Sequence, residues 1–416
     1  MRASLVLLFL SAGLACAAER EDPPWSAWWN GTHVTGEWLG ARTALADRGL
    51  TLEGHWRGIY FGILDSQSGG ANAFSEELSF ALELEAAELT RWQGLRGLSV
   101  FAEGRWRDPG PDANPNNYVE AEALFNPSRY TGGVGWRFMN AGLRYTAREF
   151  FGVADGLSVK AGWVQPQKEF ITQPLARRFA NNAMASAEGL GGNIPYGSSF
   201  TTWGGAVEVK PADRAYLKTG LYMSYFNPTD PENRGLRFRG HPDKGNGLFF
   251  LGETGVTPEF GSSRLPGHYA LGGYFYGEAS DEYGGNKYGF YAQADQMLWR
   301  EAGEQGLRMF SLWYFAPAYD NEFAFYAHGG LVYQGVIPCR DRDELLAGAV
   351  VGRYGEGAGG SKSPAPTDSV LLEAGYRVRL GGWGFVQPFA QYIVQPAGTA
   401  AVANAAILGI FLGADF

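Results

Sequence analysis

Apolar and polar residues alternate along many short segments of this 416-residue chain. In residues 98–107 the even positions carry apolar or small side chains, whereas Glu103, Arg105 and Arg107 stand at odd positions. Successive side chains of a β-strand point to opposite faces, so these three charges share one face of an extended segment. The pattern predicts strands that each have one polar and one apolar face.

Several features of the sequence together favour a transmembrane β-barrel. Beyond the N-terminus there is no run of 18 apolar residues that would form a membrane-spanning helix. The other structure that satisfies its backbone hydrogen bonds in lipid is a closed barrel. A soluble sandwich shows the same alternation because it buries its apolar faces between two sheets. The number of strands, an export signal, the terminal Phe416 and a charged fraction of only 19% favour the barrel.

The N-terminus is typical of an exported protein. Arg2 precedes a short apolar run at residues 5–10, and small residues follow up to Ala17 and Ala18. This order of basic, apolar and small segments predicts a cleaved signal peptide over residues 1–18. We therefore expect a protein of the Gram-negative outer membrane.

The fold class predicted from these patterns is all-β: a single closed antiparallel transmembrane β-barrel of about 16 strands. Residues 19–49 form a periplasmic segment with a short helix over residues 35–49, and residues 50–416 form the barrel. The long connections 109–133, 166–201 and 227–245 are expected outside the cell or folded inward. The candidate strands are 50–64, 75–90, 97–108, 134–149, 157–165, 202–210, 214–226, 246–256, 268–278, 286–298, 306–316, 322–335, 344–354, 369–380, 383–394 and 403–416.

Several segments resemble a known family. Residues 36–42 read Gly-Glu-Trp-Leu-Gly-Ala-Arg, and residues 387–398 read Gln-Pro-Phe-Ala-Gln-Tyr-Ile-Val-Gln-Pro-Ala-Gly. These segments resemble the carbohydrate-selective porin (OprB-type) family, with which residues 193–196 and 338–343 also show similarity. The chain departs from the family at Glu37 and Leu39, where Asp and Gly are usual. The resemblance implies a sixteen-stranded outer-membrane channel through which small sugars such as monosaccharides diffuse passively.

A diffusion channel needs a wetted constriction whose side chains replace part of the water around the solute. Charged side chains can hydrogen-bond sugar hydroxyls. Strand parity places a set of charges inside the barrel, of which Glu103, Arg105 and Arg107 are the strongest candidates. The other candidates are Glu83, Glu85, Arg57, Arg144 and Lys160. In the simpler alternative these charges only line a wet lumen and pair with one another.

The mixture of acidic and basic candidates favours small neutral sugars as solutes, with outer-membrane lipid around the barrel. A general or anion-selective diffusion porin stays open as the alternative, and a non-channel role is a third. The net charge of −9 argues against a nucleic-acid partner. The residues suggest no catalytic group, metal site or cofactor, and we do not expect an enzyme. Porins often form homotrimers, and a homotrimer stays an open expectation because the sequence shows no interface.

Overall fold

The computed structural model describes residues 26–66, 70–110, 125–130, 134–186, 188–194, 200–224, 247–277, 287–319, 321–356 and 367–416. The expected signal peptide, the connection 227–245 and most of the connection 109–133 lie outside these residues.

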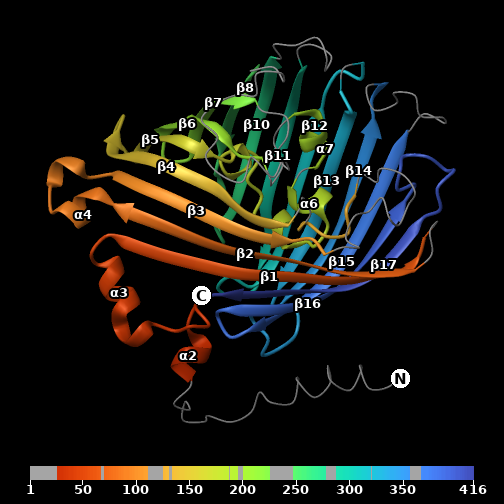
Figure 1. The fold of residues 1–416 in the computed structure, drawn as a ribbon, viewed down its shortest axis with the longest axis horizontal. Helices are drawn as coiled ribbons and strands as arrows, with labels where there is room; N and C mark the ends of the chain where they lie inside the picture. Colours follow the sequence, from red (N-terminus) through yellow and green to blue (C-terminus); the bar gives the residue numbers. More distant parts are fainter. Residues whose placement is uncertain are drawn as a thin grey trace.

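Within the described residues, sixteen long strands form one closed antiparallel sheet (Figure 1). They are β1 (Leu50–Asp65), β2 (Ala71–Glu85), β3 (Leu98–Asp108), β4 (Gly135–Phe150), β5 (Val153–Val164), β6 (Thr202–Ala212), β7 (Ala215–Ser224), β8 (Gly247–Val256), β10 (Leu265–Gly277), β11 (Lys287–Arg300), β12 (Gly306–Phe315), β13 (Phe323–Gln334), β14 (Glu344–Tyr354), β15 (Asp368–Leu380), β16 (Gly384–Val394) and β17 (Ala405–Asp415). A two-residue strand, β9 (Glu259–Phe260), pairs with the start of β10. The sequence prediction of a sixteen-stranded closed barrel is confirmed.

The barrel closes where β1 pairs with β17. The Arg57 guanidinium donates from Nη1 to the Ala414 carbonyl at 2.8 Å and pairs through Nη2 with Asp415 Oδ1 at 2.5 Å. Beyond β17, Phe416 exchanges two backbone hydrogen bonds with Gly54. A Cβ at Gly54 would lie 2.7 Å from the Phe416 ring, so glycine makes room for the terminal aromatic residue.

The two faces of the wall differ as the alternation predicts. On the last strand Leu408 and Ile410 are half exposed on the outer surface, whereas their neighbour Phe411 is buried inside. On β15 Leu372 faces outward and Glu373 is buried inside the barrel. An apolar outer face and a polar interior suit a barrel surrounded by lipid.

The N-terminal segment lies outside one end of the barrel, near the C-terminus (Figure 1). It contains α2 (Ser26–Asn30), the 3₁₀ turn η1 (Trp38–Gly40) and α3 (Ala41–Ala46). The expected helix over 35–49 is therefore shorter, because Trp38 and Leu39 have left-handed φ values of 50° and 59°. No helix among the described residues is long and apolar enough to cross a membrane.

Connections on the two ends of the barrel differ in length. The end that carries α2 and α3 has tight turns, such as residues 151–152 and 213–214, and the small helical turn α4 (Ala86–Thr90) with η2 (Gln93–Leu95). Because residues 86–90 form α4, the candidate strand 75–90 ends at Glu85. It also begins earlier than predicted, at Ala71. In bacterial barrels short turns face the periplasm and long loops face outward. We call the end with α2 and α3 the short-turn end.

Candidate pore constriction

The connection between β5 and β6 folds into the barrel. We call its described residues 165–186 and 188–194 the inner loop. It contains the 3₁₀ turns η3 (Pro166–Lys168) and η4 (Ala176–Arg178) and the short helices α6 (Asn182–Ser186) and α7 (Glu188–Asn193). Figure 1 shows α6 and α7 within the outline of the barrel, where α6 contacts β14 and α7 contacts β13. The inner loop therefore lies inside the lumen, against the wall strands β13 and β14.

Hydrogen bonds hold the inner loop to widely spaced strands. The Glu373 carboxylate on β15 accepts the backbone N–H groups of Ala180 at 2.7 Å and Asn181 at 3.0 Å. The Asn193 amide donates through Nδ2 to the Phe323 carbonyl of β13 and accepts the Phe323 backbone N–H through Oδ1, each at 2.8 Å. These contacts satisfy loop backbone groups that would otherwise be buried without partners. The loop is thereby fixed across the lumen.

Apolar packing reinforces these bonds. Phe170, Phe179 and Met184 of the inner loop are fully buried against the barrel wall. A Cβ at Gly348 of β14 would lie 2.7 Å from the Met184 side chain and 3.1 Å from the Phe179 ring. Glycine at this wall position therefore allows the loop to approach closely.

A second segment, residues 125–130 from the β3–β4 connection, packs beside the inner loop. Arg129 donates its backbone N–H to the Ala180 carbonyl, and Asn182 donates to the Asn126 carbonyl. The Ser128 hydroxyl lies 2.5 Å from the Ser75 hydroxyl of β2. Two connections, rather than one, thus narrow the interior.

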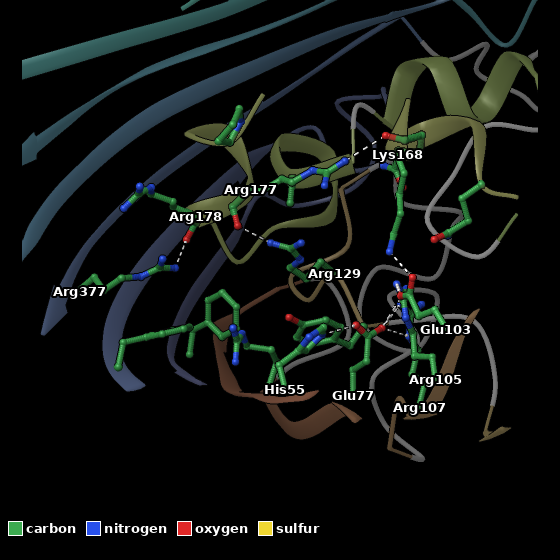
Figure 2. Close-up of a pocket in the computed structure, with 18 of the residues that line it drawn as sticks. His55, Glu77, Glu103, Arg105, Arg107, Arg129, Lys168, Arg177, Arg178 and Arg377 are labelled. Atoms are coloured by element: carbon green, nitrogen blue, oxygen red, sulfur yellow. Dashed lines mark hydrogen bonds and ion pairs between the residues drawn. The ribbon is translucent and has the colours of Figure 1, made fainter. Parts of the chain in front are cut away.

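The main hollow of the lumen, about 450 Å³ in volume, lies between these segments and the wall (Figure 2). One side of it carries a chain of ion pairs. The Glu77 carboxylate contacts the guanidinium of Arg105 at 3.3 Å and that of Arg107 at 2.5 Å. Arg105 also pairs with Glu103 at 3.0 Å, and the Asn140 amide donates to Glu103 at 2.7 Å. We call Glu77, Glu103, Arg105 and Arg107 the paired wall.

A smaller hollow of about 190 Å³ lies next to the first one. Thr51 and Glu53 from the start of β1, at the short-turn end, line it together with Glu83, Arg144 and Lys160. Glu103 and Lys168 line both hollows and form an ion pair. This pair therefore lies at the junction of the two hollows.

The structure brings together seven of the eight sequence candidates. Arg57, Glu103, Arg105 and Arg107 line the main hollow, and Glu83, Arg144 and Lys160 line the smaller one with Glu103. Glu85 lies outside both hollows, at the exposed end of β2. Arg144 pairs with Glu83 at 2.7 Å and Lys160 with Glu169 at 2.5 Å, so pairing among the charges also occurs.

Several residues that line the main hollow were not among the candidates predicted from the sequence. Glu77 shares the odd parity of Glu83 and Glu85, so strand parity would have found it. Lys168, Arg129, Arg177 and Arg178 lie in connections without periodicity, and no local pattern indicates that they face the lumen. With them the main hollow carries more basic than acidic side chains, whereas the sequence predicted a mixture of both signs without this basic excess.

Burial affects the charges of the inner loop. Desolvation lowers the pKa of the Lys168 ammonium, and the facing Glu103 carboxylate opposes that shift. Desolvation and the positive charges of Arg308 and Arg379 lower the pKa of Arg178 to about 10. The Arg178 guanidinium is therefore charged at neutral pH. Among the described residues, no group of three His, Cys, Asp or Glu side chains is placed to hold a metal ion.

A sixteen-stranded barrel whose lumen is narrowed by an inward-folded loop with paired charges is a porin. The family model of the carbohydrate-selective porin, OprB family, matches residues 71–416. The chain belongs to this family of outer-membrane sugar channels.

Solved structures show the same fold. A structure of Pseudomonas putida OprB at high pH superposes with a TM-score of 0.84 at 21% identity, covering 95% of this chain and 100% of that chain. A low-pH structure of Pseudomonas putida OprB gives a TM-score of 0.61 at 18% identity, with 93% and 99% coverage. The outer-membrane channel DcaP of Acinetobacter baumannii gives 0.50 at 9% identity, with 88% and 97% coverage. No curated protein matches the chain.

Proposed function

We propose that the protein conducts small neutral sugars, such as monosaccharides, by passive diffusion past the junction of the two hollows. The observation that carries this proposal is the position of the Glu103–Lys168 pair, which lines both hollows. Carboxylate and cationic groups side by side offer hydrogen-bond acceptors and donors to sugar hydroxyls. A solute with many hydroxyls can therefore replace its hydrogen bonds to water by hydrogen bonds to these groups at a small cost in free energy.

Passage of a solute requires no catalytic group, and we propose that the protein is not an enzyme. Glu103, Arg105 and Arg107 are the proposed first contacts of the sugar in the main hollow. Arg57 lies beside them, and Glu83, Arg144 and Lys160 follow in the smaller hollow.

The test is swelling of liposomes that contain the purified protein. Glucose should enter faster than a zwitterion of similar size, because the zwitterion must lose more hydration. Replacing Arg105 with Ala should change the glucose rate. Equal entry rates of glucose and the zwitterion would indicate a general pore. An unchanged glucose rate in the Arg105→Ala variant would show that Arg105 does not contact the sugar.

An anion-selective porin is the second candidate, favoured by the basic surplus in the main hollow. The reversal potential across planar bilayers with a salt gradient separates the two. Weak ion selectivity with a sugar preference supports the sugar channel, whereas strong anion selectivity without a sugar preference supports the alternative.

We further propose that residues 1–18 are cleaved as a signal peptide, that residues 19–49 lie in the periplasm and that residues 50–416 form the barrel. Sequencing the N-terminus of the protein purified from outer membranes tests the cleavage. A homotrimer is proposed as the assembly, and chemical cross-linking in native membranes tests it.

A further inference from the structure

The charges that line the main hollow do not balance. Its two acidic residues, Glu77 and Glu103, both belong to the paired wall, where they contact Arg105 and Arg107 or Lys168. The basic lining residues are Arg57, Arg105, Arg107, Arg129, Lys168, Arg177, Arg178, Arg377 and Arg379. Nine positive charges thus face two negative ones, and the surplus lies away from the paired wall.

The surplus extends from the middle of the hollow, where Figure 2 labels Arg129, to the side opposite the paired wall. Figure 2 shows Arg377 and Arg178 at one side of the view and Glu103, Arg105 and Arg107 at the other. We call Arg129, Arg178, Arg377 and Arg379 the basic wall. Two of them stand at alternate positions of β15, and the other two come from the segments that fold inward.

The basic wall has few carboxylate partners. Arg178 and Arg377 share one buried carboxylate, Glu344, whose Oε2 lies 3.9 Å from Arg377 Nη1. Arg129 donates instead to the Arg177 carbonyl at 2.5 Å, and Arg379 donates to the Gly382 carbonyl at 3.3 Å. Within the described part of the chain, neither Arg129 nor Arg379 forms an ion pair. Backbone carbonyls fix the direction of these guanidinium groups, and carboxylates act on them only beyond ion-pair distance: Asp415 and Asp343 on Arg379, and Glu373 on Arg129.

A cluster of oriented, partly desolvated guanidinium groups binds carboxylates well. The guanidinium fork matches a carboxylate in geometry, and charge-assisted hydrogen bonds are about twice as strong as neutral ones. The low effective dielectric constant inside a protein strengthens these hydrogen bonds further. An anion seated here would also reduce the mutual repulsion of the arginines.

We propose that the basic wall binds the carboxylate of an acidic monosaccharide, an aldonate or uronate, while the paired wall contacts its hydroxyls. This inference rests on the proposed sugar channel, because it assigns a second class of sugar to the same hollow. A singly charged sugar fits the charge layout better than a dianion, since Glu77 and Glu103 lie on the facing side. A hollow of about 450 Å³ also has the size of a small-molecule site.

The test is the inhibition of small-ion current through single channels of the full protein, with gluconate and glucose titrated separately at constant ionic strength. Gluconate should act at concentrations about tenfold lower than glucose, the effect of one added charge-assisted contact. Replacing Arg129 or Arg379 with Gln should lower this gluconate-to-glucose ratio severalfold, and Lys at either position should restore part of it.

A control variant is Arg264→Gln, which removes a positive charge from an exposed turn at the short-turn end, where Arg264 pairs with Glu259. It should leave both titrations unchanged. The inference is overturned if wild-type protein binds gluconate no better than glucose, or if both Gln variants keep the wild-type ratio. Acetate acting at the same concentrations as gluconate would also overturn it, because the site would then recognise charge alone. If glucose acts and gluconate does not, only this inference fails; if neither acts, the proposed sugar channel fails as well.

Discussion

The ammonium group of Lys168 forms an ion pair with the carboxylate of Glu103, from which it is separated by 65 residues of the chain. The pair connects the inner loop to β3 and lies where the two hollows meet. Glu103 is also held by Arg105 and Asn140, so its position does not depend on the lysine alone. The loop therefore supplies one side of the passage, and the wall supplies the other.

Replacing Lys168 with Met should weaken sugar binding at this junction while the barrel stays folded. Methionine keeps much of the side-chain length and removes the charge. The loss of one charge-assisted hydrogen bond predicts a fall of about tenfold in glucose affinity. The measurement is a glucose titration of single-channel current. Arg91→Met, at an exposed turn of the short-turn end, is the control and should behave as wild type; a wild-type titration for Lys168→Met would place the sugar path elsewhere.

Replacing Glu373 with Gln should loosen the inner loop. A glutamine offers one oxygen instead of two, so only one of the Ala180 and Asn181 N–H groups keeps its acceptor. The expected local cost is about 1.5–3 kcal/mol. We expect faster proteolysis within the inner loop and entry of larger sugars such as disaccharides. Glu304→Gln, in an exposed turn, is the matched control.

If Glu373→Gln leaves both proteolysis and the size limit unchanged, then Glu373 does not hold the loop. The other contacts of the loop, such as those of Asn193 with Phe323, would then be sufficient.

The two glutamates of β2 near the short-turn end should differ little in their effect on flux. Glu83 pairs with Arg144, but both side chains are more than one third exposed, and such pairs contribute about 0–1 kcal/mol. Glu85 lies outside both hollows. Glu83→Gln should change glucose flux slightly, and Glu85→Gln should leave it unchanged in liposome swelling. A large loss with Glu85→Gln would contradict the placement of the passage.

Replacing Leu39 with Gly should stabilise the N-terminal segment. Leu39 has a left-handed backbone and a fully exposed side chain, so the substitution removes strain and little packing. The expected gain is about 1 kcal/mol. Hydrogen exchange of residues 38–46 should slow relative to wild type. Faster exchange would show that the Leu39 side chain stabilises the segment by more than its left-handed backbone conformation destabilises it.

Strand parity predicted the outward face of the wall and the shared face of Glu103, Arg105 and Arg107, while the export signal, the number of strands and Phe416 decided for a closed barrel over a sandwich. Alternation works there because each strand must have one face toward lipid and one toward water. Parity also places Arg377 and Arg379 of the basic wall on the inner face of β15, but it could not predict Arg129 and Arg178, which lie in connections. Arg129 and Arg178 reach the lumen because their backbones are held by distant groups, such as the Arg377 guanidinium that bonds the Arg178 carbonyl. Contacts of this kind leave no local pattern.

On the proposed path, sugars pass the junction formed by Glu103 and Lys168. The most direct test is the current through single channels of wild-type protein and of Glu103→Gln, titrated with glucose. The wild-type current should fall as glucose enters, and Glu103→Gln should shift the half-effective concentration upward by about tenfold, because one charged acceptor is lost. Identical titration curves for the two proteins, or a wild-type current that glucose leaves unchanged, would contradict the passage of sugars at this junction.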